Sequence, residues 1–195
     1  SFLMLISIKI MAHLFIKEAV AETYETSKSY SKFWTIKFVK GKKELQGTQI
    51  YALFIDLEKH WKTYWKIPGP TGFKPDIWVD NKKNLSKYEI IWPAPEVFGE
   101  EELKFYGFEN MLVLPLRVEK TLAEASTSFN LNLQLGFCRD FCITDTFSFS
   151  SEGAEVASPK QNRLIEKTLN SIPQILEPAK HYIKCEIEKN ADKLN

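Results

Sequence analysis

The stretch FNLNLQLGF, residues 129–137, alternates apolar and polar side chains along its whole length. Its apolar positions are Phe129, Leu131, Leu133, Leu135 and Phe137. Its polar positions are Asn130, Asn132 and Gln134. Because successive side chains of an extended chain point to opposite faces, the alternation places all the apolar groups on one face. The stretch therefore predicts an antiparallel strand with one face on a core and the other in solvent.

Other segments repeat this period of two. In FWTIKF, residues 33–38, one face carries Trp34, Ile36 and Phe38. In TQIYALFIDLE, residues 48–58, one face carries Tyr51, Leu53, Ile55 and Leu57, and the other carries polar or mixed residues. Three shorter candidate strands are YEIIW (88–92), MLVLPLRV (111–118) and TFSFS (146–150). Several short strands without intervening helices predict a β-sandwich.

Two local features refine this prediction. GKKELQG, residues 41–47, is typical of a turn or loop between strands. Pro115 interrupts the candidate strand 111–118 and has no backbone N–H to give to a neighbour. It therefore predicts an edge strand or a bulge at that point.

One segment is typical of a helix. In SPKQNRLIEKTLNSI, residues 158–172, Ser158 is the expected N-cap, Pro159 the first helical residue, and Gln161 completes a capping box. A stripe at helical spacing then consists of Leu164, Ile165, Thr168, Leu169 and Ile172. Pro173 ends the helix, and the stripe is expected to dock on the sandwich. The tail, residues 179–195, is a candidate further strand carrying Cys185.

The composition bounds the classes of function. The chain has 195 residues, of which 44% are hydrophobic and 13% aromatic, so it has material for a packed core and is not a disordered chain. A net charge of +1 gives no electrostatic argument for binding nucleic acid or an anionic membrane surface. The function is therefore to be sought in local chemistry.

The N-terminus resembles an export signal. Residues 2–16 are mostly apolar, and Ala19 and Ala21 fit the small-residue rule for cleavage after Ala21. The alternative is an amphipathic helix or strand that belongs to the fold. The run is too short and too charged for a membrane span.

Residues 59–99 read as a long connection that is rich in aromatic residues. These are Trp61, Tyr64, Trp65, Phe73 and Trp78. Aromatic side chains at this density in a loop usually cover something. Either they seal one end of the sandwich, or they form a cap over a reactive group.

The segment GFCRDFCIT, residues 136–144, holds Cys138 and Cys142. In a straight strand these residues would lie about 13 Å apart, at roughly 3.3 Å per residue, too far for a disulfide. If they pair, the chain folds back, with residues 139–141 forming a three-residue connection or one helical turn. So small a loop is stabilised little by a crosslink, which favours an exchangeable bond over a staple.

Other interpretations of the two cysteines stay open at this point. Both thiols can be buried core residues, since free cysteine behaves as a small hydrophobe. A metal site would need two more ligands. Asp140 and Asp145 are near in sequence, whereas the three histidines, at positions 13, 60 and 181, are distant. No G-x-S-x-G motif or glycine-rich phosphate loop is present in the sequence.

Four blocks in order carry a resemblance to a known family. They are DLEKHWKTYWKIPGPTGFKPDI (56–77), IIWPAPEVF (90–98), FYGFENMLVLPLRV (105–118) and LGFCRDFCIT (135–144). Together they resemble the N-terminal periplasmic domain of DsbD/ScsB-type protein-disulfide reductases over roughly residues 30–150. The sequence departs from the family pattern at His60, where glycine is usual, and at Thr144, where proline is usual. It also departs at Pro70, Thr71 and Lys74.

The resemblance implies a mainly β, immunoglobulin-like sandwich in the periplasm, which the helix predicted at 158–172 follows. It implies that Cys138 and Cys142 are the redox pair and cycle between dithiol and disulfide, with no cofactor and no metal. A membrane-embedded thiol electron transporter would supply the electrons, and periplasmic thioredoxin-like or disulfide-bonded proteins would receive them. The domain boundaries that follow are an N-terminal segment at 1–29, the sandwich at 30–150, and a helix and tail at 151–195.

Roles for individual residues follow from the resemblance. Cys142 is expected to attack and Cys138 to resolve the mixed disulfide. Arg139 would lower, and Asp140 raise, the pKa of a neighbouring thiolate, unless both only solvate the turn. The candidates for a cap over the sulfurs are Tyr64, Trp65 and Phe73. Cys185 is left as a free thiol, an intermolecular link or a buried residue of the tail.

A second function remains compatible with the sequence. The chain can be a non-catalytic immunoglobulin-like binding module with a structural disulfide, acting as an adaptor in envelope assembly or copper tolerance. The two functions differ in how readily the cysteine pair is reduced.

Overall fold

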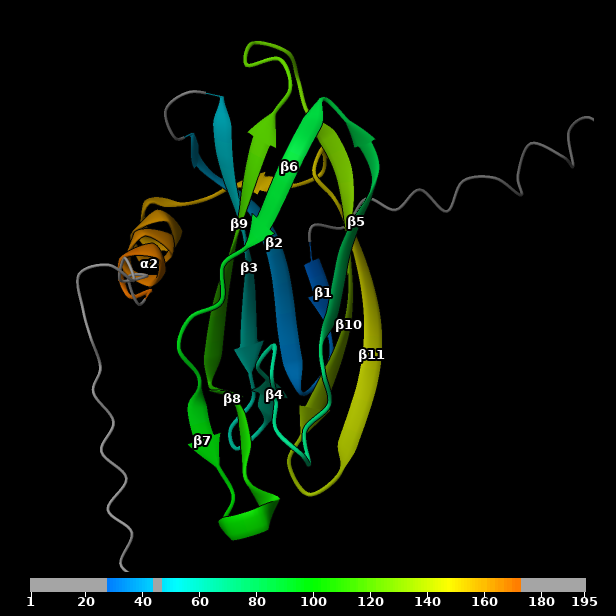
Figure 1. Cartoon of the computed structure of the whole chain (residues 1–195), viewed down its shortest axis with the longest axis vertical. Coiled ribbons are helices and arrows are strands. Elements are labelled where there is room, and N and C mark those ends of the chain that lie inside the picture. Colours follow the sequence, from blue (N-terminus) through cyan, green and yellow to red (C-terminus); the bar gives the residue numbers. More distant parts are fainter. Residues whose placement is uncertain (1–27, 44–46, 173–195) are drawn as a thin grey trace, which may run out of the picture.

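Two β-sheets packed face to face make up the computed structural model, which describes residues 28–43 and 47–172 (Figure 1). The first sheet has the order β1 (Lys28–Tyr30), β2 (Trp34–Lys43), β3 (Thr48–Leu57), β9 (Met111–Lys120) and β6 (Leu85–Ile90). The short strand β12 (Glu155–Val156) pairs in parallel with β2.

The second sheet has the order β11 (Cys142–Ser150), β10 (Ser128–Cys138), β4 (Lys62–Tyr64), β8 (Phe105–Glu109) and β7 (Glu96–Phe98). Strand β5 (Asp76–Lys83) also pairs with β10. A short 3-10 helix, η1 (Glu101–Leu103), joins β7 to β8, and α2 (Pro159–Asn170) follows the sandwich. The predicted immunoglobulin-like antiparallel sandwich with a C-terminal helix is confirmed.

The core between the sheets consists of the alternating residues that the sequence pattern identified. All five apolar positions of residues 129–137 are buried, and the ring of Trp34 from the first sheet stacks on Phe137 at 4.0 Å between centroids. Since burial of one such side chain stabilises a fold by about 1.5–3 kcal/mol, this face fixes the register of β10.

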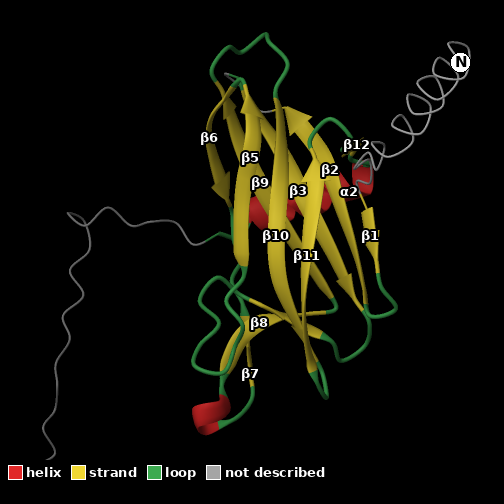
Figure 2. Ribbon diagram, turned by 90° about the vertical axis from the view of Figure 1, so that its right-hand side faces the viewer, coloured by secondary structure: helices red, strands yellow, loops and turns green. Residues whose placement is uncertain are grey.

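The predicted helix docks on the outer face of the first sheet. On β3 the face opposite the core carries Ile50, Ala52 and Phe54, and all three are buried. Helix α2 covers them, with Ile165 buried in the contact (Figure 2). The predicted capping box is present: the Gln161 N–H donates to Ser158 Oγ (3.3 Å), and the Ser158 N–H donates to Gln161 Oε1 (2.9 Å).

Strand β9 corrects the prediction made from Pro115. It lies between β3 and β6, neither at an edge nor at a bulge in its pairing with β3. The Ile91 N–H donates to the Pro115 carbonyl (2.8 Å), so the proline's polar groups face the point where β6 ends. The missing N–H therefore removes one bond at the last position of a ladder, where its cost is low.

Two predicted loops are partly strands. Residues 41–43 continue β2, and residues 59–99 contain β4, β5 and β7 besides β6, which overlaps the predicted strand at 88–92. Most side chains of β5 are exposed, so its sequence lacks the apolar alternation that marked β10.

Two predictions concern the ends of the chain. The predicted export signal and the candidate strand with Cys185 fall outside the described residues. Within residues 28–43 and 47–172, no helix is both long and apolar enough to cross a bilayer.

Candidate functional site

The two cysteines lie at the tip of the β10–β11 hairpin. The strands pair continuously from Asn130 and Ser150 to Cys138 and Cys142, which are the last partners of the ladder. Residues 139–141 connect them, and the Arg139 N–H donates to the Phe141 carbonyl (3.1 Å). The Cα atoms of the cysteines are 4.2 Å apart, and the two sulfurs form a disulfide. The chain thus folds back through a three-residue connection.

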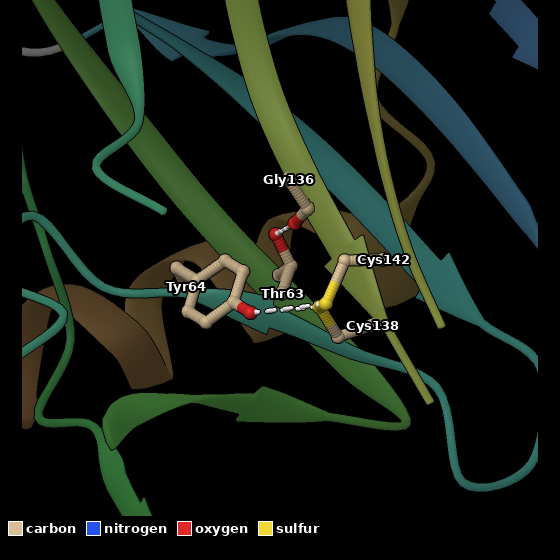
Figure 3. The surroundings of a disulfide bond; sticks show 5 residues. All are labelled: Thr63, Tyr64, Gly136, Cys138 and Cys142. Carbon is tan, nitrogen blue, oxygen red and sulfur yellow. Dashed lines mark hydrogen bonds between the residues drawn. A yellow bond between two sulfur atoms is a disulfide. The ribbon is translucent and has the colours of Figure 1, made fainter. Parts of the chain in front are cut away.

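The two sulfurs have different surroundings. Cys138 is buried, with 8% of its surface exposed, whereas Cys142 is exposed. The hydroxyl of Tyr64 lies 2.7 Å from Cys138 Sγ and 3.8 Å from Cys142 Sγ (Figure 3). Disulfide sulfurs carry no hydrogen, so the hydroxyl is the donor. Burial raises the pKa of Tyr64 above its ordinary value, which keeps the phenol a neutral donor at physiological pH.

Strand β4 holds Tyr64 against the pair. Thr63 lies opposite Phe137 in the register, and its hydroxyl donates to the Gly136 carbonyl (2.9 Å; Figure 3). On its other side β4 pairs with β8, where Tyr64 lies opposite Gly107. A strand of three residues bonded on both sides has little freedom to move, so the position of the hydroxyl is set by the sheet.

The segment between β4 and β5 lies beside the same end of β10. Phe73 packs on Gly136: a Cβ at position 136 would lie 2.8 Å from Phe73 Cβ. Gly72 packs on Tyr64, because a Cβ there would lie 3.0 Å from Tyr64 Cδ1. The Tyr106 N–H donates to the Pro68 carbonyl (2.9 Å) and ties the segment to β8. The structure therefore brings the Tyr64 hydroxyl to the cysteine pair and Phe73 to Gly136, two residues before Cys138.

The remaining predicted residues have other contacts. Trp65 packs against the inter-sheet core, and its ring lies 6.5 Å from that of Tyr106. Arg139 Nε donates to Asp140 Oδ2 (2.8 Å), so these two charges pair with each other at the hairpin tip. A role for Trp65 in covering the sulfurs, and for Arg139 and Asp140 in tuning them, stays a prediction.

Two features near the pair were not predicted from the sequence. Phe141, between the cysteines, is half exposed and packs on Trp61. The adjacent His60 has a φ of 69°, a left-handed conformation that glycine adopts most easily. The family pattern has glycine there, which was an available signal for this turn. In the described part of the chain, no three His, Cys, Asp or Glu side chains gather as metal ligands.

Comparison with solved structures shows the same fold in a known domain. The N-terminal periplasmic domain of ScsB from Proteus mirabilis is 23% identical, with a TM-score of 0.59, over 73% of this chain and 56% of that chain. This chain therefore spans little more than half the length of that structure. The reduced N-terminal domain of DsbD from Neisseria meningitidis is 10% identical, with a TM-score of 0.37, over 62% of this chain and 86% of that chain.

Comparison of the sequence with family models and with curated proteins gives two results. No curated protein sequence matches the chain. The model for the N-terminal region of the thiol:disulfide interchange protein DsbD matches residues 36–152, which is more than half of the chain and includes both cysteines, Tyr64 and Phe73. The chain belongs to the family of DsbD N-terminal domains.

Proposed function

We propose that this thiol–disulfide exchange domain relays electrons in the periplasm, from a membrane-embedded thiol electron transporter to thioredoxin-like or disulfide-bonded proteins, through Cys138 and Cys142. The observation that carries the proposal is the asymmetry of the pair: Cys142 is exposed, while Cys138 is buried under the hydroxyl of Tyr64. Family membership supports thiol–disulfide exchange and a partner that carries thiols. Within this proposal, residues 30–150 are the exchange domain and 151–195 an appended helix and tail.

Reduction of the domain begins at the exposed sulfur. A donor thiolate attacks Cys142 Sγ, the bond between the two cysteines breaks, and Cys138 leaves with the electron pair as a thiolate. The hydroxyl of Tyr64 lies within hydrogen-bond reach of this leaving sulfur. A second donor thiolate then attacks the donor's own sulfur in the mixed disulfide and releases Cys142. The donor becomes a disulfide and the domain a dithiol, so two electrons have been transferred.

Delivery of the electrons reverses these steps. The Cys142 thiolate attacks a substrate disulfide and displaces one substrate thiolate. Cys138 then attacks Cys142 Sγ, which restores the disulfide of the domain and releases the second substrate thiolate. Each step needs a thiolate, an accessible sulfur and alignment of three sulfur atoms.

The reduction potential of the pair tests this proposal. The domain is equilibrated with dithiothreitol or glutathione buffers, and the oxidised fraction is read by mass spectrometry. A potential well above about −300 mV is expected, since structural disulfides lie below that value. A pair that stays oxidised in strong reductant would instead indicate a staple, and the chain would be the binding module.

Replacement of Tyr64 by phenylalanine is expected to slow reduction of the domain by dithiothreitol roughly tenfold, because a hydrogen bond to a charged group stabilises it by about 1.5–3 kcal/mol. The variant keeps the ring, which packs on Phe105 at 5.3 Å, and removes only the donor. The ultraviolet absorbance of thiolate in the reduced domain is expected to fall as well. Tyr106→Phe, on the neighbouring strand and partly exposed, is the matched control. Equal rates of reduction for Y64F and wild type would contradict a role for the Tyr64 hydroxyl in stabilising the leaving thiolate.

Opening of the segment over Gly136 is expected to speed the reaction with small thiols. Phe73→Ala removes the half-buried ring, and Gly136→Ala places a Cβ where that side chain lies. Each variant is expected to react roughly tenfold faster with dithiothreitol, since loss of about 1.4 kcal/mol from the closed form gives that factor. Tyr88→Ala, which removes a half-buried aromatic residue from β6 in the other sheet, controls for general destabilisation. Unchanged rates in both variants would mean that Phe73 only seals the end of the sandwich.

A further inference from the structure

The tip of the hairpin carries a half-exposed aromatic residue that is next in sequence to the exposed cysteine. Phe141 precedes Cys142 in the sequence and has 50% of its surface exposed. The inner part of its ring meets Trp61 edge to face, with centroids 5.3 Å apart and planes at 89°. It also meets Phe33 edge to face, with centroids 6.1 Å apart. The outer part of the ring faces solvent.

The tip is held from below by a fully buried side chain. Trp61 has 0% of its surface exposed and stacks on Phe33 at 4.4 Å between centroids. The guanidinium of Arg139 lies 5.7 Å from the centre of the Trp61 ring, so both flanks of the three-residue connection rest on one indole. The Arg139 N–H bond to the Phe141 carbonyl closes the turn. Phe141 is thus held in one orientation. Less conformational entropy of this side chain is therefore lost when a partner binds it.

Formation of a mixed disulfide at Cys142 brings a partner close to Phe141. In a mixed disulfide the Cα of the partner cysteine lies within about 7 Å of the Cα of Cys142. The Cα of Phe141 is about 3.8 Å from that of Cys142, because consecutive residues are joined by a trans peptide. A folded partner whose cysteine reaches Cys142 is therefore close enough to contact Phe141. A small thiol reaches the same sulfur without this contact.

We propose that Phe141, supported by Trp61, is the contact by which this domain selects folded protein thiols over small ones. The partner it fits is a protein with an apolar recess beside its reactive cysteine, into which the exposed half of the ring inserts. The inference rests on the proposed function and adds the surface that chooses the partner. In the step concerned, the partner thiolate attacks Cys142 Sγ and Cys138 leaves with the electron pair, as before.

The test compares a protein thiol with a small thiol on the same variants. Reduction of the oxidised domain is followed with reduced thioredoxin and with dithiothreitol, for wild type, Phe141→Ala and Phe141→Leu. In Phe141→Ala, kcat/KM for thioredoxin is expected to fall roughly tenfold more than the dithiothreitol rate, mainly through KM, as expected for an interface anchor. Phe141→Leu, which stays apolar, is expected to keep most of the wild-type value. Leu122→Ala, at an exposed apolar residue in the connection before β10, controls for loss of any surface hydrophobe.

Each other outcome has a definite meaning. If thioredoxin and dithiothreitol rates fall together in Phe141→Ala, the side chain only shapes the hairpin, and the inference is overturned. It is also overturned if wild type reacts no faster with thioredoxin than with dithiothreitol, or if Phe141→Ala matches wild type. Failure of the proposed function is distinguishable, because the pair would then resist both reductants in wild type as well.

Discussion

Serine at position 142 is expected to slow disulfide exchange roughly a hundredfold, whereas serine at position 138 is expected to trap a partner on the domain. Cys142→Ser leaves only Cys138, which is buried and lies under the hydroxyl of Tyr64. Cys138→Ser leaves the exposed Cys142 with no neighbour to resolve a mixed disulfide. Each variant loses one sulfur atom relative to the wild type. A difference between their rates therefore reports how accessible the remaining sulfur is.

Oxidised glutathione is a suitable probe for this difference. Both variants are made in a Cys185→Ala background, so that the one remaining cysteine of the pair is the site of any adduct. Cys138→Ser is expected to accumulate a one-to-one glutathione adduct on Cys142, detected by mass spectrometry. Cys142→Ser is expected to form its adduct roughly a hundredfold more slowly, because the buried thiol reacts only when the structure around it opens locally.

The opposite ranking would exchange the roles of attacking and resolving cysteine. Equal rates would mean that the burial of Cys138 does not govern reactivity. A domain in which neither variant forms an adduct, and both lose stability, would have a staple in place of a redox pair. The expected ranking and a potential well above about −300 mV together would distinguish the relay from the binding module.

Local patterns in the sequence predicted most of the fold. Alternation identified the core face of β10 because that face is fully buried and its opposite face is polar. The capping box of α2 was predicted because Ser158 and Gln161 interact within one turn. Such features depend on residues that are neighbours along the chain, so no knowledge of the tertiary structure is needed.

Features that depend on which strands become neighbours were not predicted. Pro115 implies an edge only if the strand beside it continues, and β6 ends there. The resemblance supplied Tyr64 as a cap candidate. Its hydroxyl reaches Cys138, 74 positions further along the chain, only because β4 pairs with β10. The exposure of Phe141 could not be predicted, because an aromatic residue between two cysteines is locally indistinguishable from a core residue. Its exposure is set by the length of the hairpin connection.

Alanine at position 107 is expected to be the most destabilising single substitution near the site. Gly107 on β8 lies opposite Tyr64 on β4, and a Cβ at this position would collide with the carbonyl oxygen of Thr63. The clash is with backbone, and the Thr63 hydroxyl also bonds the Gly136 carbonyl, so β4 cannot move aside cheaply. We expect a loss of roughly 3 kcal/mol or more in the free energy of unfolding. The melting temperature would fall by roughly 10 °C in a thermal scan.

Gly153→Ala is the matched control, since the nearest atom to its Cβ would be the Ser150 carbonyl oxygen at 3.8 Å. This variant is expected to melt as wild type does. In Gly107→Ala, any folded protein has β4 displaced, which withdraws the Tyr64 hydroxyl from Cys138 and slows reduction by dithiothreitol as Tyr64→Phe does. If Gly107→Ala instead keeps its melting temperature and its rate, the pairing of β4 with β8 does not hold Tyr64. The packing of Gly72 on the Tyr64 ring would then have to position the hydroxyl, and Gly72→Ala would become the substitution that separates it from the sulfur.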